Sequence, residues 1–205
     1  MYLFISSKGK HGRASSSRNR TAPGRANVNK DNGLVVVAVR DPYSWAKSMC
    51  KNPYIVKWHH TENVCPNLTS KVNTWGEHDN LMEFWNFWYK DYLNKFPYPW
   101  ILVRVEDLTL RPKDTVTRMC NCAGGKVIDT FAYSVSSAKA KGGHKSSTGM
   151  LKACKSVIKR EGNGGFSDKD YRIAKEKTDE ELLALFGYKH PRTKAASYYN
   201  TCYYT

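Results

Sequence analysis

The fold is set by residues 33–42, which read Gly33-Leu-Val-Val-Val-Ala-Val-Arg-Asp-Pro42. The first seven residues form a continuous apolar run without polar alternation, which is typical of a central parallel strand covered on both faces. Asp is a favoured N-cap and Pro a favoured first helical residue, so Asp41 and Pro42 predict a helix over about residues 43–50. A strand that leads directly into a helix N-terminus is the basic unit of phosphate sites in α/β folds.

Outward from this unit, helical and strand patterns alternate along the chain. Residues 81–93 carry apolar side chains at helical spacing, with Asp79 or Asn80 as the cap, and residues 100–105 form a second buried-strand pattern. Three further helices are predicted, one opened by Pro112 and ended before Gly124-Gly125, one capped by Ser167, and one with a capping box from Thr178 to Glu181 and a stop at Gly187. The alternation predicts the α/β class.

Length and charge predict the domain organisation. The chain has 205 residues, 40% hydrophobic and 13% aromatic, which is enough for one domain with a core. The net charge is +15, and residues 1–30 and 130–160 each hold seven basic residues and no acidic one. We therefore expect a basic disordered arm over residues 1–32, a domain over residues 33–191 and a flexible tail over residues 192–205.

Membrane and metal-binding patterns are missing from the sequence. No run approaches the roughly 18 to 20 apolar residues of a membrane-spanning helix, so we expect no membrane span. The six cysteines are scattered, and no Cys-x-x-Cys pair has zinc-site spacing. Cys120 and Cys122 lie two residues apart in a helical pattern and so point to different faces. We therefore expect no metal site.

Arg40 and Ser48 form the most informative pair of polar residues. The pattern places Arg40 at the carboxyl end of a buried strand and Ser48 two turns into the next helix. One phosphate could contact both, because the guanidinium offers a planar pair of donors and the helix N-terminus adds partial positive charge. The alternative is that Arg40 pairs with Glu106 or Asp107 while Ser48 faces solvent.

This pair resembles a motif of the sulfotransferases that use 3′-phosphoadenosine 5′-phosphosulfate (PAPS), chiefly their carbohydrate-directed Golgi branch. In that family an Arg after a hydrophobic strand, usually in Arg-[Asp/Asn]-Pro, is followed eight residues later by a Ser. The resemblance continues in Val103-Arg-Val-Glu-Asp-Leu108, although an aromatic residue is usual at Val105, and in Leu185-Phe-Gly-Tyr-Lys-His-Pro191. It covers roughly residues 34–191, in the order of the family.

The resemblance implies a P-loop-like parallel β-sheet flanked by helices and PAPS as co-substrate. It implies that Arg40 and Ser48 bind the 3′-phosphate of the nucleotide. Lys141, Gly142 and Gly143 would belong to a basic loop that closes over the same nucleotide, since glycines let backbone N–H groups approach an anion. A solvated basic loop is the alternative for these three residues.

The sequence departs from the family before residue 33. There the family has a first strand, a loop that binds the 5′-phosphosulfate, and a helix. Lys10 and Gly12 are the nearest equivalents of that loop, but Arg13 and Ala14 stand where Thr or Ser is expected. We therefore expect a domain that is incomplete at its N-terminus, with no catalytic residue identified.

Several functions remain open at this stage. The first is transfer of a sulfuryl group from PAPS to a hydroxyl or amine of a carbohydrate or small acceptor, with a truncated or inactive member as a variant. The second is a non-catalytic basic module that binds nucleic acid or sulfated polysaccharide. A nucleotide kinase is disfavoured, because no G-x-x-x-x-G-K-[S/T] sequence occurs. The resemblance implies the Golgi or secretory route, whereas a chain complete as written would be cytoplasmic.

Overall fold

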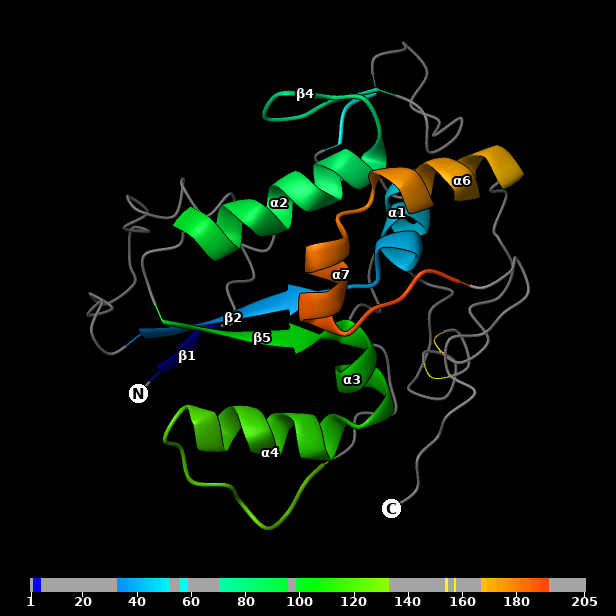
Figure 1. Ribbon diagram of the computed structural model, residues 1–205. Coiled ribbons are helices and arrows are strands. Elements are labelled where there is room, and N and C mark those ends of the chain that lie inside the picture. Colours follow the sequence, from blue (N-terminus) through cyan, green and yellow to red (C-terminus); the bar gives the residue numbers. More distant parts are fainter. Residues whose placement is uncertain are drawn as a thin grey trace.

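Strand β2 is the central strand of a three-stranded parallel sheet with the order β1-β2-β5 (Figure 1). The strands are β1 (Tyr2–Phe4), β2 (Gly33–Val39) and β5 (Trp100–Arg104). This computed structural model describes residues 2–4, 33–51, 56–58, 71–95, 99–132, 154, 157 and 167–191. The mixed α/β class and the central parallel strand predicted from residues 33–39 are confirmed.

Six helices are formed within the described residues. They are α1 (Pro42–Lys51), α2 (Leu81–Lys95), α3 (Val105–Leu110), α4 (Pro112–Cys122), α6 (Asp168–Lys177) and α7 (Glu180–Phe186). A short antiparallel hairpin, β3 (Val72–Asn73) and β4 (Glu77–His78), precedes α2 in the sequence and lies on the side of α2 that faces away from the sheet (Figure 1). In Figure 1, α2 and α7 lie on one side of the sheet and α4 on the other.

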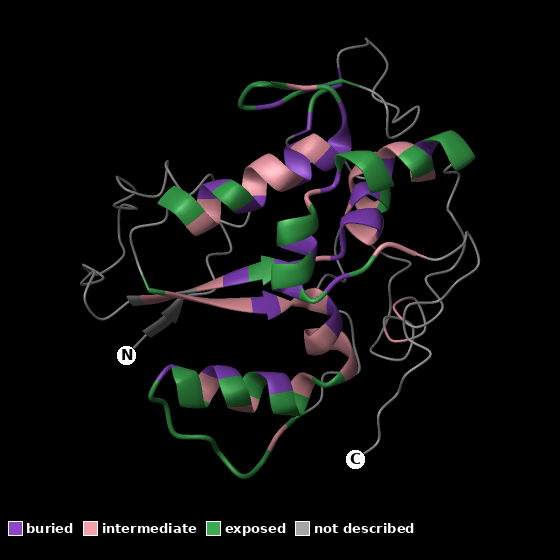
Figure 2. Ribbon diagram, in the orientation of Figure 1, coloured by how far each residue is buried: buried purple, intermediate pink, exposed green. Residues whose placement is uncertain are grey.

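The two faces of β2 are covered to different extents. Val37 and Val39 are buried in a core formed with α2 and α7. On the opposite face Ala38 is exposed, and the helix on that side, α4, packs against β5. Figure 2 shows α4 exposed along the side that faces away from the sheet. The expectation that β2 is covered on both faces is therefore wrong at Ala38.

The turn from β2 into α1 follows local capping chemistry. A side-chain oxygen of Asp41 accepts a hydrogen bond from the backbone N–H of Ser44 at 2.9 Å, which is the N-cap contact. Pro42 is the first helical residue, where its missing N–H costs nothing. The predicted helix over residues 43–50 is thus confirmed to within one residue at each end.

A second core lies where α1, α2, α6 and the hairpin meet. Leu81, Met82 and Phe84 of α2 are buried there together with Val72 of β3. Asn80 caps α2, since its side-chain oxygen accepts from the N–H groups of Met82 and Glu83 at 3.0 Å each. Of the two predicted caps, Asn80 is therefore the one used.

Two local predictions from the sequence differ from the structure. The strand pattern over residues 100–105 ends at Arg104, and Val105 begins α3. The cap of α7 is Asp179, whose side chain accepts from the N–H of Leu182, whereas Thr178 terminates α6 by donating to the carbonyl of Ala174 at 2.6 Å. The prediction that Thr178 caps α7 is wrong.

The predicted arm and tail are described only in part. Tyr2–Phe4, which we placed in the basic arm of residues 1–32, forms β1 and pairs with Gly33–Val35, so the sheet extends into that segment. The rest of the arm and the tail of residues 192–205 lie outside the described residues. Among the helices described here, none is both long and apolar enough to cross a bilayer.

Candidate functional site

The candidate site lies at the carboxyl edge of the sheet, where Arg40 and Asp41 connect the end of β2 to α1. Polar groups of three aromatic side chains bind successive backbone carbonyls there. The Tyr89 hydroxyl donates to Ala38 at 3.3 Å, the Tyr188 hydroxyl lies 3.4 Å from the carbonyl oxygen of Val39, and the Trp85 indole N–H donates to Arg40 at 3.1 Å. These contacts hold the backbone at the end of β2 in place.

The guanidinium of Arg40 is not engaged by the carboxylates that we considered as its partners. Glu106 accepts instead from the backbone N–H of Asp41 at 3.1 Å and from the Tyr188 hydroxyl at 2.7 Å. Asp107 pairs with Arg104. Within the described residues no hydrogen bond or ion pair occupies the Arg40 guanidinium, and its side chain is half-buried. The alternative in which a carboxylate locks Arg40 is therefore not observed.

Ser48 lies on α1, seven residues beyond Asp41 and therefore about 10 Å along the helix axis. Ser44 lies one turn earlier on the same helix face, and both residues are half-buried. Neither hydroxyl binds another described residue. Ser44 and Ser48 thus share one face of α1, and Arg40 lies two residues before the helix begins. We did not single out Ser44 from the sequence, although its four-residue spacing from Ser48 is the signal that identifies it.

A buried hydrogen-bond network joins the ends of β2 and β5 to the C-terminal segment. This polar network consists of Asp41, Glu106 and Tyr188, together with the ion pair of Arg104 and Asp107. Glu106 is 3% exposed and Asp41 is fully buried. Arg104 also donates to the carbonyl of Gly187 at 3.3 Å and lies over the ring of Tyr188. Glu106 and Asp107 therefore act structurally, by binding other groups of the protein.

The environment of the network shifts two ionisation equilibria. Burial raises the pKa of Tyr188 far above its ordinary value, and the nearby Glu106 carboxylate raises it further. Partial burial favours a higher pKa for Asp107, but hydrogen bonds from Arg104 and Arg111 outweigh burial and hold that pKa below its ordinary value. Tyr188 is thus a stable hydrogen-bond donor, and Asp107 is a stable anion.

A second series of hydrogen bonds joins Tyr43, in the first turn of α1, to His190 and Glu180. The Tyr43 hydroxyl lies 2.6 Å from Nδ1 of His190, and Nε2 of His190 lies 2.8 Å from a carboxylate oxygen of Glu180. Tyr43 is buried and stacks on Tyr171 of α6. Neither contact was predicted, because the sequence separation of 147 residues between Tyr43 and His190 leaves no local signal.

The remaining predicted ligand residues follow α4 in the sequence. Lys141, Gly142 and Gly143 lie outside the described residues. In the part of the chain that is described, no group of three or more His, Cys, Asp or Glu residues has the arrangement of a metal site. Comparisons with protein-family models, with curated proteins and with solved structures found no match to this chain.

Proposed function

We propose that the protein binds PAPS, with Arg40 and Ser48 on the 3′-phosphate, and transfers its sulfuryl group to a hydroxyl or amine of a carbohydrate or small acceptor. One observation carries the proposal: no described residue binds the Arg40 guanidinium, while Glu106 and Asp107, the two carboxylates considered as its partners, bind other groups. A guanidinium binds phosphate through two parallel hydrogen bonds, and the N-terminus of α1 adds partial positive charge.

The arrangement of the sheet supports this proposal. In open parallel sheets, ligands bind outside the carboxyl ends of the strands, which is where β2 leads into α1. A P-loop-like fold is part of the proposal, and the parallel order β1-β2-β5 is compatible with it. Lys141, Gly142 and Gly143 are proposed to close over the nucleotide.

The proposed reaction needs alignment more than covalent catalysis. The bond between sulfur and the phosphate oxygen of PAPS breaks, a bond from sulfur to the acceptor oxygen or nitrogen forms, and a base takes the proton of the acceptor. Such transfers depend on in-line positioning and on neutralising the charge of the leaving nucleotide. Arg40 would hold that nucleotide, and no residue is proposed as the base.

A disulfide at Cys50 supports placing the protein on the secretory route. Cys50 lies in α1 and is disulfide-bonded, with its partner outside the described residues. Cys120, Cys122 and Cys154 are free thiols. Because disulfides persist mainly in oxidising compartments, the bond favours the Golgi or secretory route over the cytoplasm.

Calorimetry with adenosine 3′,5′-bisphosphate, the product nucleotide, tests the proposal. We expect micromolar binding that Arg40→Ala weakens at least about tenfold, because charge-assisted hydrogen bonds to phosphate are lost. Ser48→Ala should weaken binding less, since it removes one donor. Arg118→Ala is the matched control, because Arg118 is an exposed arginine on α4.

The outcomes separate an enzyme from an inactive relative. Binding together with sulfuryl transfer from labelled PAPS to hydroxylated acceptors supports the full proposal. Nucleotide binding without transfer to any acceptor supports a truncated or inactive member. Failure of the wild-type protein to bind the nucleotide, or equal losses in Arg40→Ala and Arg118→Ala, contradicts the proposed site.

The uneven charge favours one other function, a non-catalytic module that binds nucleic acid or sulfated polysaccharide. Residues 1–30 and 130–160 together hold fourteen basic residues and no acidic one. Binding by such stretches depends steeply on salt, because it releases counterions from the polyanion. Affinity for heparin or DNA that falls steeply with salt and is unchanged by Arg40→Ala, without any nucleotide binding, would favour this function.

A further inference from the structure

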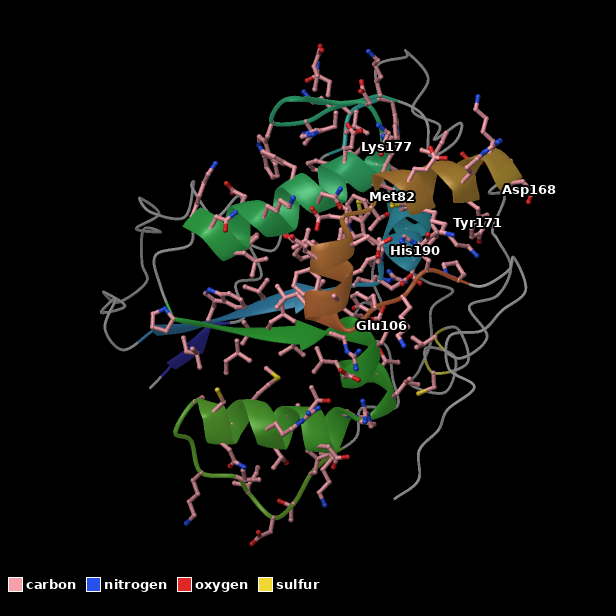
Figure 3. All side chains as sticks on the ribbon, in the orientation of Figure 1. Met82, Glu106, Asp168, Tyr171, Lys177 and His190 are labelled. Atoms are coloured by element: carbon pink, nitrogen blue, oxygen red, sulfur yellow. The ribbon has the colours of Figure 1, made fainter. Side chains whose placement is uncertain are left out.

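The chain segment after α7 runs alongside the candidate site. We call Gly187–Pro191 the C-terminal strap. It begins at Gly187, whose φ of 68° is in the left-handed region and ends α7. In Figure 1 the strap passes beside α1 and the carboxyl end of β2, and Figure 3 shows His190 next to α1. The strap thus lies beside the turn between β2 and α1, which is about 150 residues earlier in the sequence.

Two strap residues, two positions apart, bind the two sides of the start of α1. Tyr188 donates to Glu106, whose other oxygen accepts from the backbone N–H of Asp41, the N-cap. His190 binds the hydroxyl of Tyr43, the second helical residue. Arg40 immediately precedes this doubly bound turn.

We propose that Tyr188 and His190 are positioning residues, which hold the first turn of α1 so that Arg40 and Ser48 face one phosphate. The ligand part of this inference rests on the proposed nucleotide site. The mechanical part does not, because it concerns only how the strap restrains Asp41 and Tyr43. Neither strap residue contacts the ligand in this proposal.

The geometry explains why both contacts are needed. Glu106 and Asp41 are buried, so loss of the Tyr188 hydroxyl leaves a carboxylate oxygen without its donor in a dry environment. The second contact depends on the imidazole orientation, which Glu180 sets by binding the other ring nitrogen at 2.8 Å. Tyr43 is in turn held by its stack on Tyr171, with ring centroids 5.8 Å apart. A shift of the strap therefore shifts the start of α1.

Variants at His190 separate hydrogen bonding from packing. His190→Asn keeps an acceptor near the position of Nδ1, which faces Tyr43, whereas His190→Gln keeps a polar group near Nε2, which faces Glu180. Both remove the imidazole ring. Tyr43→Phe removes the same hydrogen bond from the other side and retains the aromatic ring. Tyr188→Phe tests the first contact in the same way.

The experiment combines hydrogen exchange of the full chain with calorimetry. We expect His190→Gln, Tyr43→Phe and Tyr188→Phe to speed amide exchange in the first turn of α1 by about fivefold, the equivalent of one lost hydrogen bond. The same variants should weaken binding of adenosine 3′,5′-bisphosphate to a similar degree. His190→Asn should change both measurements less than His190→Gln, because it retains an acceptor for Tyr43 although it loses the contact with Glu180, and exchange in α4 should not change in any variant.

Two results would overturn the inference. One is wild-type exchange in the first turn of α1 in all of the disrupting variants. The other is equal change in α1 and α4, which would indicate general destabilisation. If the wild-type protein does not bind the bisphosphate, the proposed function fails, and exchange alone then decides whether the strap positions α1. If Tyr188→Phe does not fold, the His190 and Tyr43 variants still give the answer.

Discussion

The polar network at the carboxyl ends of β2 and β5 and the aromatic cluster along α2 hold the same strand in different ways. The aromatic cluster consists of Trp85 and Tyr89 of α2 with Phe186 of α7. It packs on β2 over a broad apolar area, which has no strict direction. The polar network acts through single atoms at fixed distances and angles.

This difference indicates that the aromatic cluster mainly stabilises the fold, whereas the polar network mainly fixes the orientation of the site residues. Apolar packing can adjust to a change of similar volume, whereas a buried donor that loses its acceptor keeps the full cost of desolvation. Trp85 connects the two regions, since its ring packs with Tyr89 and Phe186 while its N–H binds the carbonyl of Arg40. The site residues are thus oriented by polar contacts and supported by aromatic ones.

The largest expected effect is that of Trp85→Ala. Trp85 is fully buried, so the variant should lower the free energy of unfolding by about 3–5 kcal/mol through lost packing and a residual cavity. Urea denaturation followed by circular dichroism measures the loss. Trp75→Ala is the control, because Trp75 is 39% exposed and should cost about 1 kcal/mol or less. Equal losses in the two variants would show that α2 does not carry the main core.

A smaller loss is expected from Glu106→Ala in the polar network. The change leaves the N–H of Asp41 and the hydroxyl of Tyr188 without their acceptor, which should lower the free energy of unfolding by about 2–3 kcal/mol. Glu106→Gln keeps one carbonyl oxygen and an amide at nearly the same positions, so it should cost less than half as much. The same denaturation assay compares them. If Gln were no better than Ala, the negative charge rather than hydrogen bonding would stabilise the turn.

Local signals in the sequence were sufficient to predict α1 and α2. Asp41 and Pro42 predicted the start of α1, and the spacing of apolar residues predicted α2, because capping and periodicity depend only on neighbouring residues. The start of α3 at Val105 could not be read this way, since a β-branched residue continues the apolar strand pattern. The roles of Thr178 and Asp179 could not be distinguished either, because both are favoured N-cap residues and they are adjacent in the sequence.

The site could be predicted only where its residues share one local unit. Arg40 directly follows β2 and Ser48 lies in α1, the next element, so their positions in the fold follow from the local pattern. The contacts of Tyr188 with Glu106 and of His190 with Tyr43 span 82 and 147 residues. Such contacts depend on how the C-terminal strap packs, which no local pattern encodes. The exposure of Ala38 likewise has no local signal, because residues 33–39 form one continuous apolar run.

The smallest expected effect is the contribution of Asp107, in the polar network, to the pH dependence of stability. Asp107 has a folded-state pKa below its ordinary 3.8, since hydrogen bonds from Arg104 and Arg111 outweigh the effect of burial. Its contribution to stability is therefore complete above the ordinary pKa and is lost as the pH falls through the folded-state pKa. Between pH 7 and about pH 3, Asp107→Asn should lose less unfolding free energy than the wild type. Urea denaturation at each pH measures the difference.

A variant of the aromatic cluster completes this comparison. Trp85→Phe changes apolar packing but no titrating group, so its stability should fall with decreasing pH as steeply as that of the wild type. Asp179 also has a lowered pKa, because the hydrogen bond from Lys90 outweighs partial burial, and it should leave a residual slope in Asp107→Asn. Parallel curves for Asp107→Asn and the wild type would show that the Arg104–Asp107 pair does not stabilise the fold, and the polar network would then rest on Glu106 and Tyr188.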